Sequence, residues 1–161
     1  MHLHVNNLMT LPTAPQMAAW RALFTAHSTA RKRADAALRM AQLPSLETYD
    51  VLLELDRDTA RNGLMAKDLQ TRLLLPQYGV SRLVDRMVAQ GLLRRAANPG
   101  DGRSTLLHIT ADGRKLRRKM WNVYGPIITE CMQGLKPGQL DRLADLLLKF
   151  DTGMTFQSVS R

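Results

Sequence analysis

The chain has 161 residues, of which 45% are hydrophobic and 23% are charged, and these values are typical of one globular domain with its own core. No apolar run approaches the roughly 20 residues that span a bilayer, the N-terminus has no signal-peptide pattern, and the single Cys131 excludes a disulfide within one chain. We therefore expect a cytoplasmic protein without a membrane partner, and its net charge of +9 favours acidic partners.

The excess charge lies in the middle of the chain. Residues 63–119 hold 12 basic and 4 acidic side chains, a net charge of +8. The rest of the chain holds 11 basic and 10 acidic side chains, a net charge of +1. A concentrated positive field attracts polyanions, of which nucleic acid is the commonest, although a solubilising surface would show the same charge. Charge alone does not decide between nucleic-acid binding and a solubilising surface, so the predicted secondary structure is needed as well.

The first third of the chain is predicted to be helical. Apolar residues at helical spacing predict a helix over residues 17–41, and Pro44 ends this pattern. Ser45 is expected to cap a second helix, which carries an apolar stripe. The polar run at residues 56–63 then predicts a turn.

Two short helices are predicted next, over about residues 65–74 and 76–90. Pro76 suits the first position of a helix because proline has no N–H to leave unpaired, and Gly91 is a typical residue after a helix end. The one or two residues between the two helices indicate a helix-turn-helix.

A β-hairpin is predicted after Gly91. Residues 92–97 and 105–110 have the character of short strands, and NPGDGRS at residues 98–104 is rich in turn formers. We expect this loop to be longer than a two-residue turn.

The last third of the chain is again predicted to be helical. Thr110 is expected to cap a long helix in which Gly125-Pro126 introduces a kink, and a last helix follows the turn at residues 135–139. Cys131 lies among apolar residues of the long helix, where we expect it to be buried and unreactive rather than a redox sensor.

The predicted helix over residues 76–90 has two different faces. One face is apolar and is expected to pack on the preceding helix. The opposite face carries side chains that bind base edges or phosphates: Gln77, Tyr78, Ser81, Arg82 and Arg86. The second helix of a helix-turn-helix enters the major groove, so we predict that Arg82 and Gln77 contact bases. The alternative is an ordinary solvated face.

Two segments of this region, LLLPQYGVSRLVDRMVAQGLLRR and NPGDGRSTLLHITADGRKL, resemble the winged helix-turn-helix of the MarR (multiple antibiotic resistance regulator) family. The family wing reads D-x-R, then a strand, then L-T-x-x-G, and the matching positions here are Asp101, Arg103, Ile109, Thr110 and Gly113. LPSLETYDVLLEL also looks like the second helix of the family, so that the resemblance covers about residues 16–150.

The resemblance implies a mainly α fold with a small β-hairpin. The implied parts are a single MarR-like domain (16–150) with dimerisation helices (16–44 and 110–150) and a DNA-binding lobe (45–109), between a flexible N-terminus (1–15) and a flexible tail (151–161). It also implies a homodimeric transcriptional regulator, usually a repressor, that binds a pseudo-palindromic duplex and responds to a small phenolic or other anionic effector. We expect Arg103 to enter a minor groove and Asp101 to orient its guanidinium.

The family's effector pocket lies between the dimer helices and the DNA-binding lobe. By this resemblance Trp20, His27 and Tyr49 are candidates to line it, although core packing or a dimer contact is the favoured explanation of each. The basic run at residues 114–119 could contact the DNA backbone or be solvated, and we favour a solvated run that adds long-range attraction for DNA.

Signatures of catalysis do not occur in the sequence. GDGR does not have the spacing of a Walker loop, no histidine pair has the spacing of a helical zinc site, and Gly-x-Ser-x-Gly does not occur. We therefore expect no enzyme activity, metal or cofactor. The remaining alternatives are a sequence-indifferent architectural DNA-binding protein, and an enzyme or protein-binding module that happens to be basic.

Overall fold

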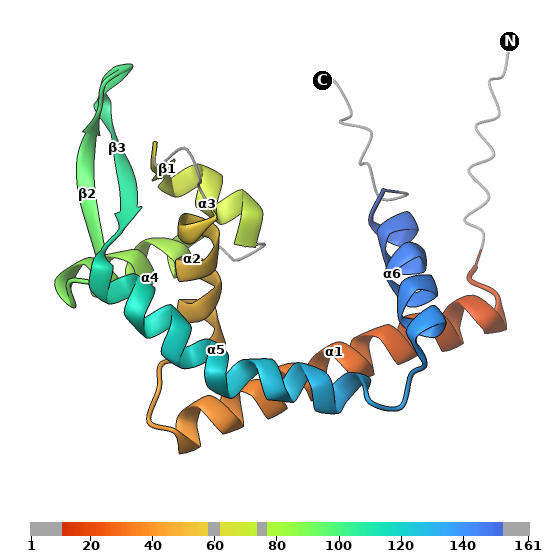
Figure 1. Cartoon of the computed structure of the whole chain (residues 1–161). Coiled ribbons are helices and arrows are strands. Elements are labelled where there is room, and N and C mark those ends of the chain that lie inside the picture. The colour runs from red at the N-terminus through yellow and green to blue at the C-terminus, as the bar shows by residue number, and fades with distance from the viewer. Residues whose placement is uncertain (1–10, 58–61, 74–76, 153–161) are drawn as a thin grey trace, which may run out of the picture.

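The computed structural model describes residues 11–57, 62–73 and 77–152. A lobe of short helices and a sheet stands at one end of two long helices, and the last helix rises at their other end (Figure 1). In chain order the described elements are α1 (Ala14–Met40), α2 (Leu46–Asp56), β1 (Leu64–Met65), α3 (Ala66–Leu73), α4 (Gln77–Ala89), β2 (Leu93–Asn98), β3 (Asp101–Ile109), α5 (Ala111–Met132) and α6 (Pro137–Thr152).

The two N-terminal helices are confirmed, but the start of the first and the capping hydrogen bond of the second differ from prediction. α1 begins three residues early because Thr13 and Gln16 form a capping box, in which each side chain bonds to the other residue's backbone N–H. Ser45 occupies the cap position of α2, yet its side chain makes no capping hydrogen bond. Instead the carboxylate of Asp35 in α1 accepts a hydrogen bond from the Leu46 backbone N–H at 3.0 Å.

The sheet has three antiparallel strands in the order β1-β3-β2, whereas the sequence predicted only the hairpin. Leu64 and Met65 form β1 beside β3, so the following helix begins at Ala66. The prediction of a long hairpin loop at residues 98–104 is wrong, because Pro99 and Gly100 alone separate the two strands. The pairing jumps from Ala97 opposite Thr105 to Asn98 opposite Asp101, which leaves an irregular stretch in β3 near the turn.

Thr110 caps α5 as predicted, and its hydroxyl accepts a hydrogen bond from the Gly113 N–H at 3.1 Å. The same hydroxyl lies 2.7 Å from the Gly91 carbonyl oxygen, and therefore joins the start of α5 to the end of α4. α5 continues through Pro126 to Met132 as one helix. Within the described residues, no helix combines the length and apolar character that a bilayer span requires.

The buried residues form two clusters. One cluster fills the lobe between α2, α3, α4 and the sheet, with fully buried members such as Leu52, Leu69 and Met87. The other joins α1, α2 and α5 through Ala34, Leu38, Leu46, Tyr49 and Met120. α2 contributes to both clusters and so connects the lobe to the long helices.

Candidate nucleic-acid interface

The buried face of α4 anchors this helix in the lobe. Val80, Leu83, Val84 and Met87 are each at most 5% exposed and belong to the lobe's core cluster. Their spacing of three and four residues puts them on one side of the helix, as the sequence predicted. The opposite side of α4 is therefore held in a fixed orientation toward solvent.

That opposite side carries three of the predicted DNA contacts in exposed positions. Ser81, Arg82 and Arg86 are all exposed. Gln77 and Tyr78 lie in the first turn of α4, but their side chains, like Pro76, fall outside the described residues. A Cβ placed on Gly79 would meet no other atom within 4 Å, so the start of the helix is open to an approaching surface.

One acidic residue interrupts this basic face, and the structure places an arginine beside it. The Asp85 carboxylate lies 2.5 Å from the guanidinium of Arg95 in β2. This pair joins α4 to the hairpin and offsets the charge of Asp85, which would otherwise repel phosphate. This ion pair could not be predicted from the sequence, because Asp85 and Arg95 lie ten positions apart, one on a helix and the other on a strand.

The hairpin of β2 and β3 projects from the lobe (Figure 1). Its tip is held by local hydrogen bonds, in which the Asn98 carboxamide oxygen accepts from the Gly100 N–H at 3.0 Å and its amide group donates to Ser104 at 2.8 Å. Asp101 is exposed at this tip. The side chain of Arg103 lies outside the described residues, so the proposed support of Arg103 by Asp101 stays a prediction.

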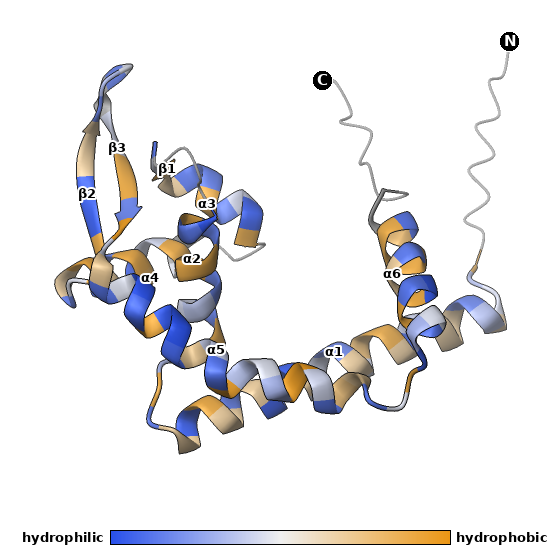
Figure 2. Ribbon diagram, in the orientation of Figure 1, coloured by the Kyte–Doolittle hydropathy of each residue, from blue (hydrophilic) through white to orange (hydrophobic). Residues whose placement is uncertain are grey.

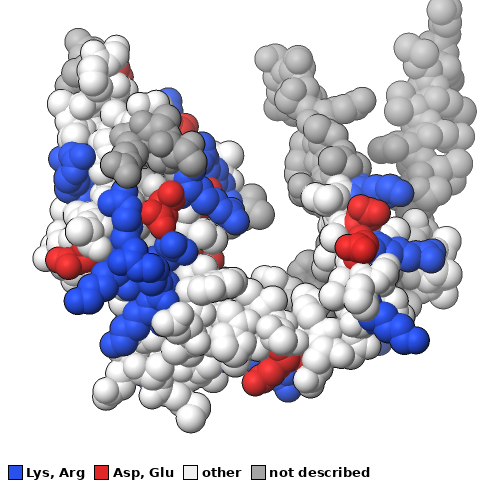
Figure 3. Space-filling view, in the orientation of Figure 1, with Lys and Arg blue, Asp and Glu red and all other residues white. Residues whose placement is uncertain are grey.

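The basic run at residues 114–119 differs from the prediction that it is simply solvated. Lys and Arg side chains gather over the first half of α5 and the adjoining lobe (Figure 3). Within this group, however, Arg114 and Arg117 are partly buried and lie 3.0 and 2.7 Å from the two carboxylate oxygens of Asp56 at the end of α2. Two cations of the run therefore fix α5 against α2, while Lys115, Arg118 and Lys119 are exposed.

The three effector candidates are not brought together. His27 lines a cavity of about 340 Å³ between α1, α2 and α5, together with Arg31, Asp50, Tyr124 and Cys131. The other two candidates do not line this cavity. Tyr49 is buried, and its ring packs against the rings of Trp121 and Tyr124. Trp20 lines a separate groove near α6. Cys131 is half-buried rather than fully buried as expected.

Burial changes the acidity of two groups that line this cavity. It raises the pKa of the Asp50 carboxyl, an effect that the Arg31 guanidinium partly offsets. Burial likewise raises the pKa of the Tyr124 hydroxyl. Asp50 was not a sequence candidate, because it is one of four acids in α2 and nothing in the sequence distinguishes it from the others.

A helix-turn-helix whose second helix shows an exposed basic face, followed by a hairpin at its side, defines a winged helix-turn-helix protein. The model of the MarR family matches residues 43–104, which run from just before α2 into β3. MarR-family proteins are transcriptional regulators rather than enzymes.

A curated relative is similar to part of the chain. The chain is 31% identical over 83 residues to YkoM, an uncharacterized HTH-type transcriptional regulator of Bacillus subtilis, and this covers 52% of the chain and 54% of YkoM. The match thus spans about half the length of that curated relative.

Solved structures share the fold over most of the chain. Sco3205, a MarR family transcriptional regulator from Streptomyces coelicolor solved with DNA, has a TM-score of 0.81 at 20% identity and covers 93% of this chain and 94% of its own. BpsR of Bordetella bronchiseptica, whose DNA binding is regulated by 6-hydroxynicotinic acid, has a TM-score of 0.74 at 22% identity and covers 88% of this chain and 98% of its own.

Proposed function

We propose that this protein is a homodimeric transcriptional regulator that binds double-stranded DNA sequence-specifically and represses transcription until a small effector releases it. The observation that carries the proposal is the exposed face of α4, where Ser81, Arg82 and Arg86 stand opposite four buried apolar residues. Residues 45–109 form the DNA-binding lobe in this proposal. Arg82 and Gln77 read bases, Tyr78, Ser81 and Arg86 hold phosphates or neighbouring bases, and Arg103, oriented by Asp101, enters the minor groove.

The apolar surface of α1 and α6 supports a dimer. Apolar residues lie along α6 and along the adjoining part of α1 (Figure 2). Trp20, Phe24 and Phe150 are 50%, 54% and 44% exposed, and a groove of about 1070 Å³ runs between the two helices. Monomers rarely expose a large contiguous apolar patch, so a second copy of these helices is the occupant we propose.

A dimer determines the form of the operator. A two-fold axis through the paired helices relates two copies of α4, so each half of a pseudo-palindrome meets one copy. Centres of the half-sites are then about 10 bp apart, because both helices must face the same side of the duplex.

The cavity between α1, α2 and α5 is the proposed effector site, because it lies between the long helices and the lobe. Arg31 in the lining lies 2.7 Å from the Glu47 carboxylate and 3.9 Å from that of Asp35. Its guanidinium has five N–H donors, so we propose that the remaining ones bind an anionic effector, with His27 in the same lining. Tyr49 acts indirectly by holding Tyr124, whose ring centroid is 5.3 Å away. Trp20 belongs to the groove with Phe150 and is assigned to the dimer contact rather than to this cavity.

Competition binding tests the proposal. Labelled duplex from the DNA upstream of the gene is titrated with the protein, and unlabelled upstream or random duplex is added as competitor. Arg82→Ala is compared with Arg118→Ala, which removes the same charge from an exposed position on α5. We expect Arg82→Ala to weaken specific binding by about 5- to 150-fold and to relax base preference, while Arg118→Ala changes affinity little.

Other outcomes contradict the proposal in different ways. Equal competition by upstream and random DNA, with both variants weakened alike, would show a sequence-indifferent architectural protein. If the protein did not bind duplex DNA even at low salt, the DNA-binding proposal would be wrong.

A further inference from the structure

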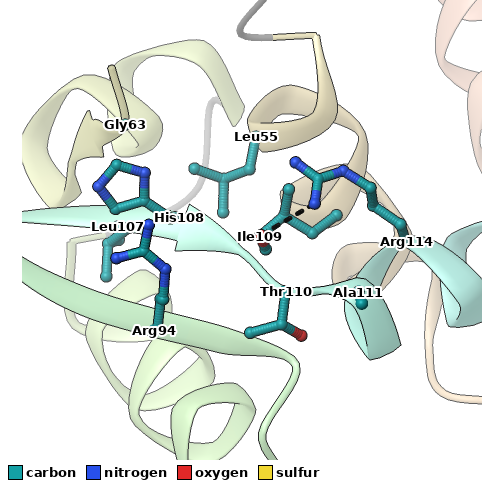
Figure 4. Close-up of a pocket in the computed structure, with 9 residues that line it drawn as sticks. All are labelled: Leu55, Gly63, Arg94, Leu107, His108, Ile109, Thr110, Ala111 and Arg114. Atoms are coloured by element: carbon teal, nitrogen blue, oxygen red, sulfur yellow. Dashed lines mark hydrogen bonds between the residues drawn. The ribbon is translucent and has the colours of Figure 1, made fainter. Parts of the chain in front are cut away.

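A second pocket, of about 410 Å³, lies on the lobe where the hairpin meets α2 and the start of α5. Figure 4 shows Arg94 and His108 on adjacent strands and Arg114 on the other side of Ile109. This pocket shares only the helices α2 and α5 with the proposed effector cavity, and no lining residue is common to both. Sequence reasoning assigned no role to Arg94, His108 or Arg114 individually.

The register of the sheet brings Arg94 and His108 together. They are direct partners in the antiparallel pair of β2 and β3. Side chains alternate between the faces of a strand, and Leu93, Leu107 and Ile109 are buried in the lobe core, so Arg94 and His108 lie on the outer face. Directly opposed residues are close enough for the guanidinium and the imidazole to contact one ligand.

The backbone of Gly63 closes one side of the pocket against the His108 ring. A Cβ at this position would lie 2.7 Å from the Cε1 atom of His108, and Gly63 has a φ of +79°, which other residues rarely adopt. The backbone at Gly63 therefore passes directly over the imidazole and limits its movement.

Arg114 brings a second guanidinium to the pocket from α5. Its Nε atom lies 3.0 Å from an Asp56 carboxylate oxygen, and its Nη1 donates to the Ile109 carbonyl at 3.3 Å. A guanidinium has five N–H donors in a planar fork, so these two contacts leave donors for a further acceptor.

The pocket has no acid of its own among the described residues that line it. Asp56 is the carboxylate near Arg114, and it is shared between Arg114 and Arg117. Within the described part of the chain, Arg94 has no carboxylate within 4.0 Å. Arg94 and Arg114 thus bring two guanidiniums to one cavity, and among the described residues Asp56 is the carboxylate recorded beside them. This arrangement favours an anion.

We propose that this pocket binds a small organic anion that carries a phosphate or carboxylate group. Arg94 and Arg114 hold the anionic group, and the rest of the ligand lies against the His108 ring and Leu55. The cavity volume is within the range of about 300–1000 Å³ that is common for small-molecule sites. The site goes beyond the proposed function, because its occupancy requires neither DNA nor the cavity between α1, α2 and α5.

Titration of the full-length protein with phenyl phosphate, in the absence of DNA, tests this proposal. Arg94→Gln removes one pocket charge at an exposed position, and Arg95→Gln is the matched control because it removes the same charge from the opposite face of the same strand. We expect Arg94→Gln to weaken calorimetrically measured binding about tenfold or more and Arg95→Gln to change it less than about twofold.

Proton NMR of the histidine rings locates the bound probe. The His108 resonance, assigned with His108→Gln, should move during the titration while the His27 resonance stays in place. Movement of His27 alone would place the probe in the other cavity and overturn the proposal. Equal weakening by the two arginine variants would show diffuse attraction to charge, which also overturns it.

The DNA backbone is the competing source of a phosphate group, and a separate binding experiment distinguishes it. Should phenyl phosphate fail to bind while Arg94→Gln weakens duplex binding more than Arg118→Gln, which leaves the pair of Asp85 and Arg95 intact, the pocket would be a backbone contact and the small-anion proposal would be wrong. Absence of phenyl phosphate binding with unchanged DNA affinity would overturn it too, while leaving the proposed function intact.

Discussion

Gly113 lies where α5 begins and packs directly against the end of α4. A Cβ on this residue would overlap the Leu92 carbonyl oxygen and lie 2.8 Å from a side-chain carbon of Ile109. Neither neighbour can move easily, because Leu92 and Ile109 are buried in the lobe core. The glycine thus permits a close approach between the hairpin base and α5.

Replacing this glycine should destabilise the protein. We expect Gly113→Ala to lower the free energy of unfolding by about 1–3 kcal/mol, as overpacking of a core commonly does, measured by denaturant titration. Gly138→Ala in α6 is the matched control, because a Cβ there meets no atom within 4 Å. If Gly113→Ala were as stable as this control, Leu92 and Ile109 would be able to move aside at little cost in stability.

Asp50 makes the stability of the folded protein depend on pH. Burial raises the pKa of its carboxyl, so the folded protein holds this proton more tightly than the unfolded chain. The associated stability is present below the ordinary carboxyl pKa and is lost as the pH rises through the raised value. Asp50→Asn removes the ionisation without a change of shape.

We expect Asp50→Asn to be more stable than the parent protein at neutral pH, with the difference disappearing in acid, when thermal unfolding is followed across this range. Asp141→Asn, at an exposed position on α6, is the control and should not change the pH dependence. If Asp50→Asn were less stable at neutral pH, the ionised carboxylate would be making a favourable contact that outweighs its burial.

At the scale of the elements, α2 and α5 are held together by Asp56 with Arg114 and Arg117. These side chains are 20–36% exposed, so solvent screens their attraction in part. A double-mutant cycle separates the pair from other effects of each change. We expect Asp56→Ala and Arg114→Ala to show a coupling energy of about 1 kcal/mol in denaturant unfolding. Strictly additive losses would mean that the two side chains are neighbours without a stabilising interaction.

The elements differ in how far the sequence predicts them. α4 was predictable because its apolar residues recur at helical spacing and Gly91 marks its end, and the Thr110 cap follows from the same kind of local rule. β1 was not, because a strand of two residues is too short to show an alternating pattern.

Contacts between residues far apart in the chain could not be predicted from the sequence, for a different reason. Asp35 caps α2 from another helix, and Asp56 binds Arg114 across 58 positions, so neither pair is encoded in a local pattern. The exposed face of α4 was predictable for the same reason that the helix was. The pocket of Arg94 and His108 depends on strand register. This register follows the irregularity between Ala97 and Asn98, which the sequence did not reveal.

At the scale of the whole molecule, the apolar groove between α1 and α6 predicts self-association. Leu147 is 42% exposed and lines this groove, whereas Met40 is 87% exposed at the far end of α1. We expect Leu147→Glu to convert a dimer to a monomer in sedimentation measurements, because it places a charge in the proposed interface. Met40→Glu introduces the same charge and should leave the dimer intact. A dimer that survives Leu147→Glu would place the interface elsewhere.

Selection of bound duplexes from a random library tests the central claim most directly, because it requires the exposed face of α4 and the dimer to act together. We expect enrichment of one pseudo-palindrome whose half-sites are about 10 bp apart, with Arg82→Ala losing preference at one or two positions in each half. Recovery of unrelated sequences at a retention that depends only on salt would contradict it.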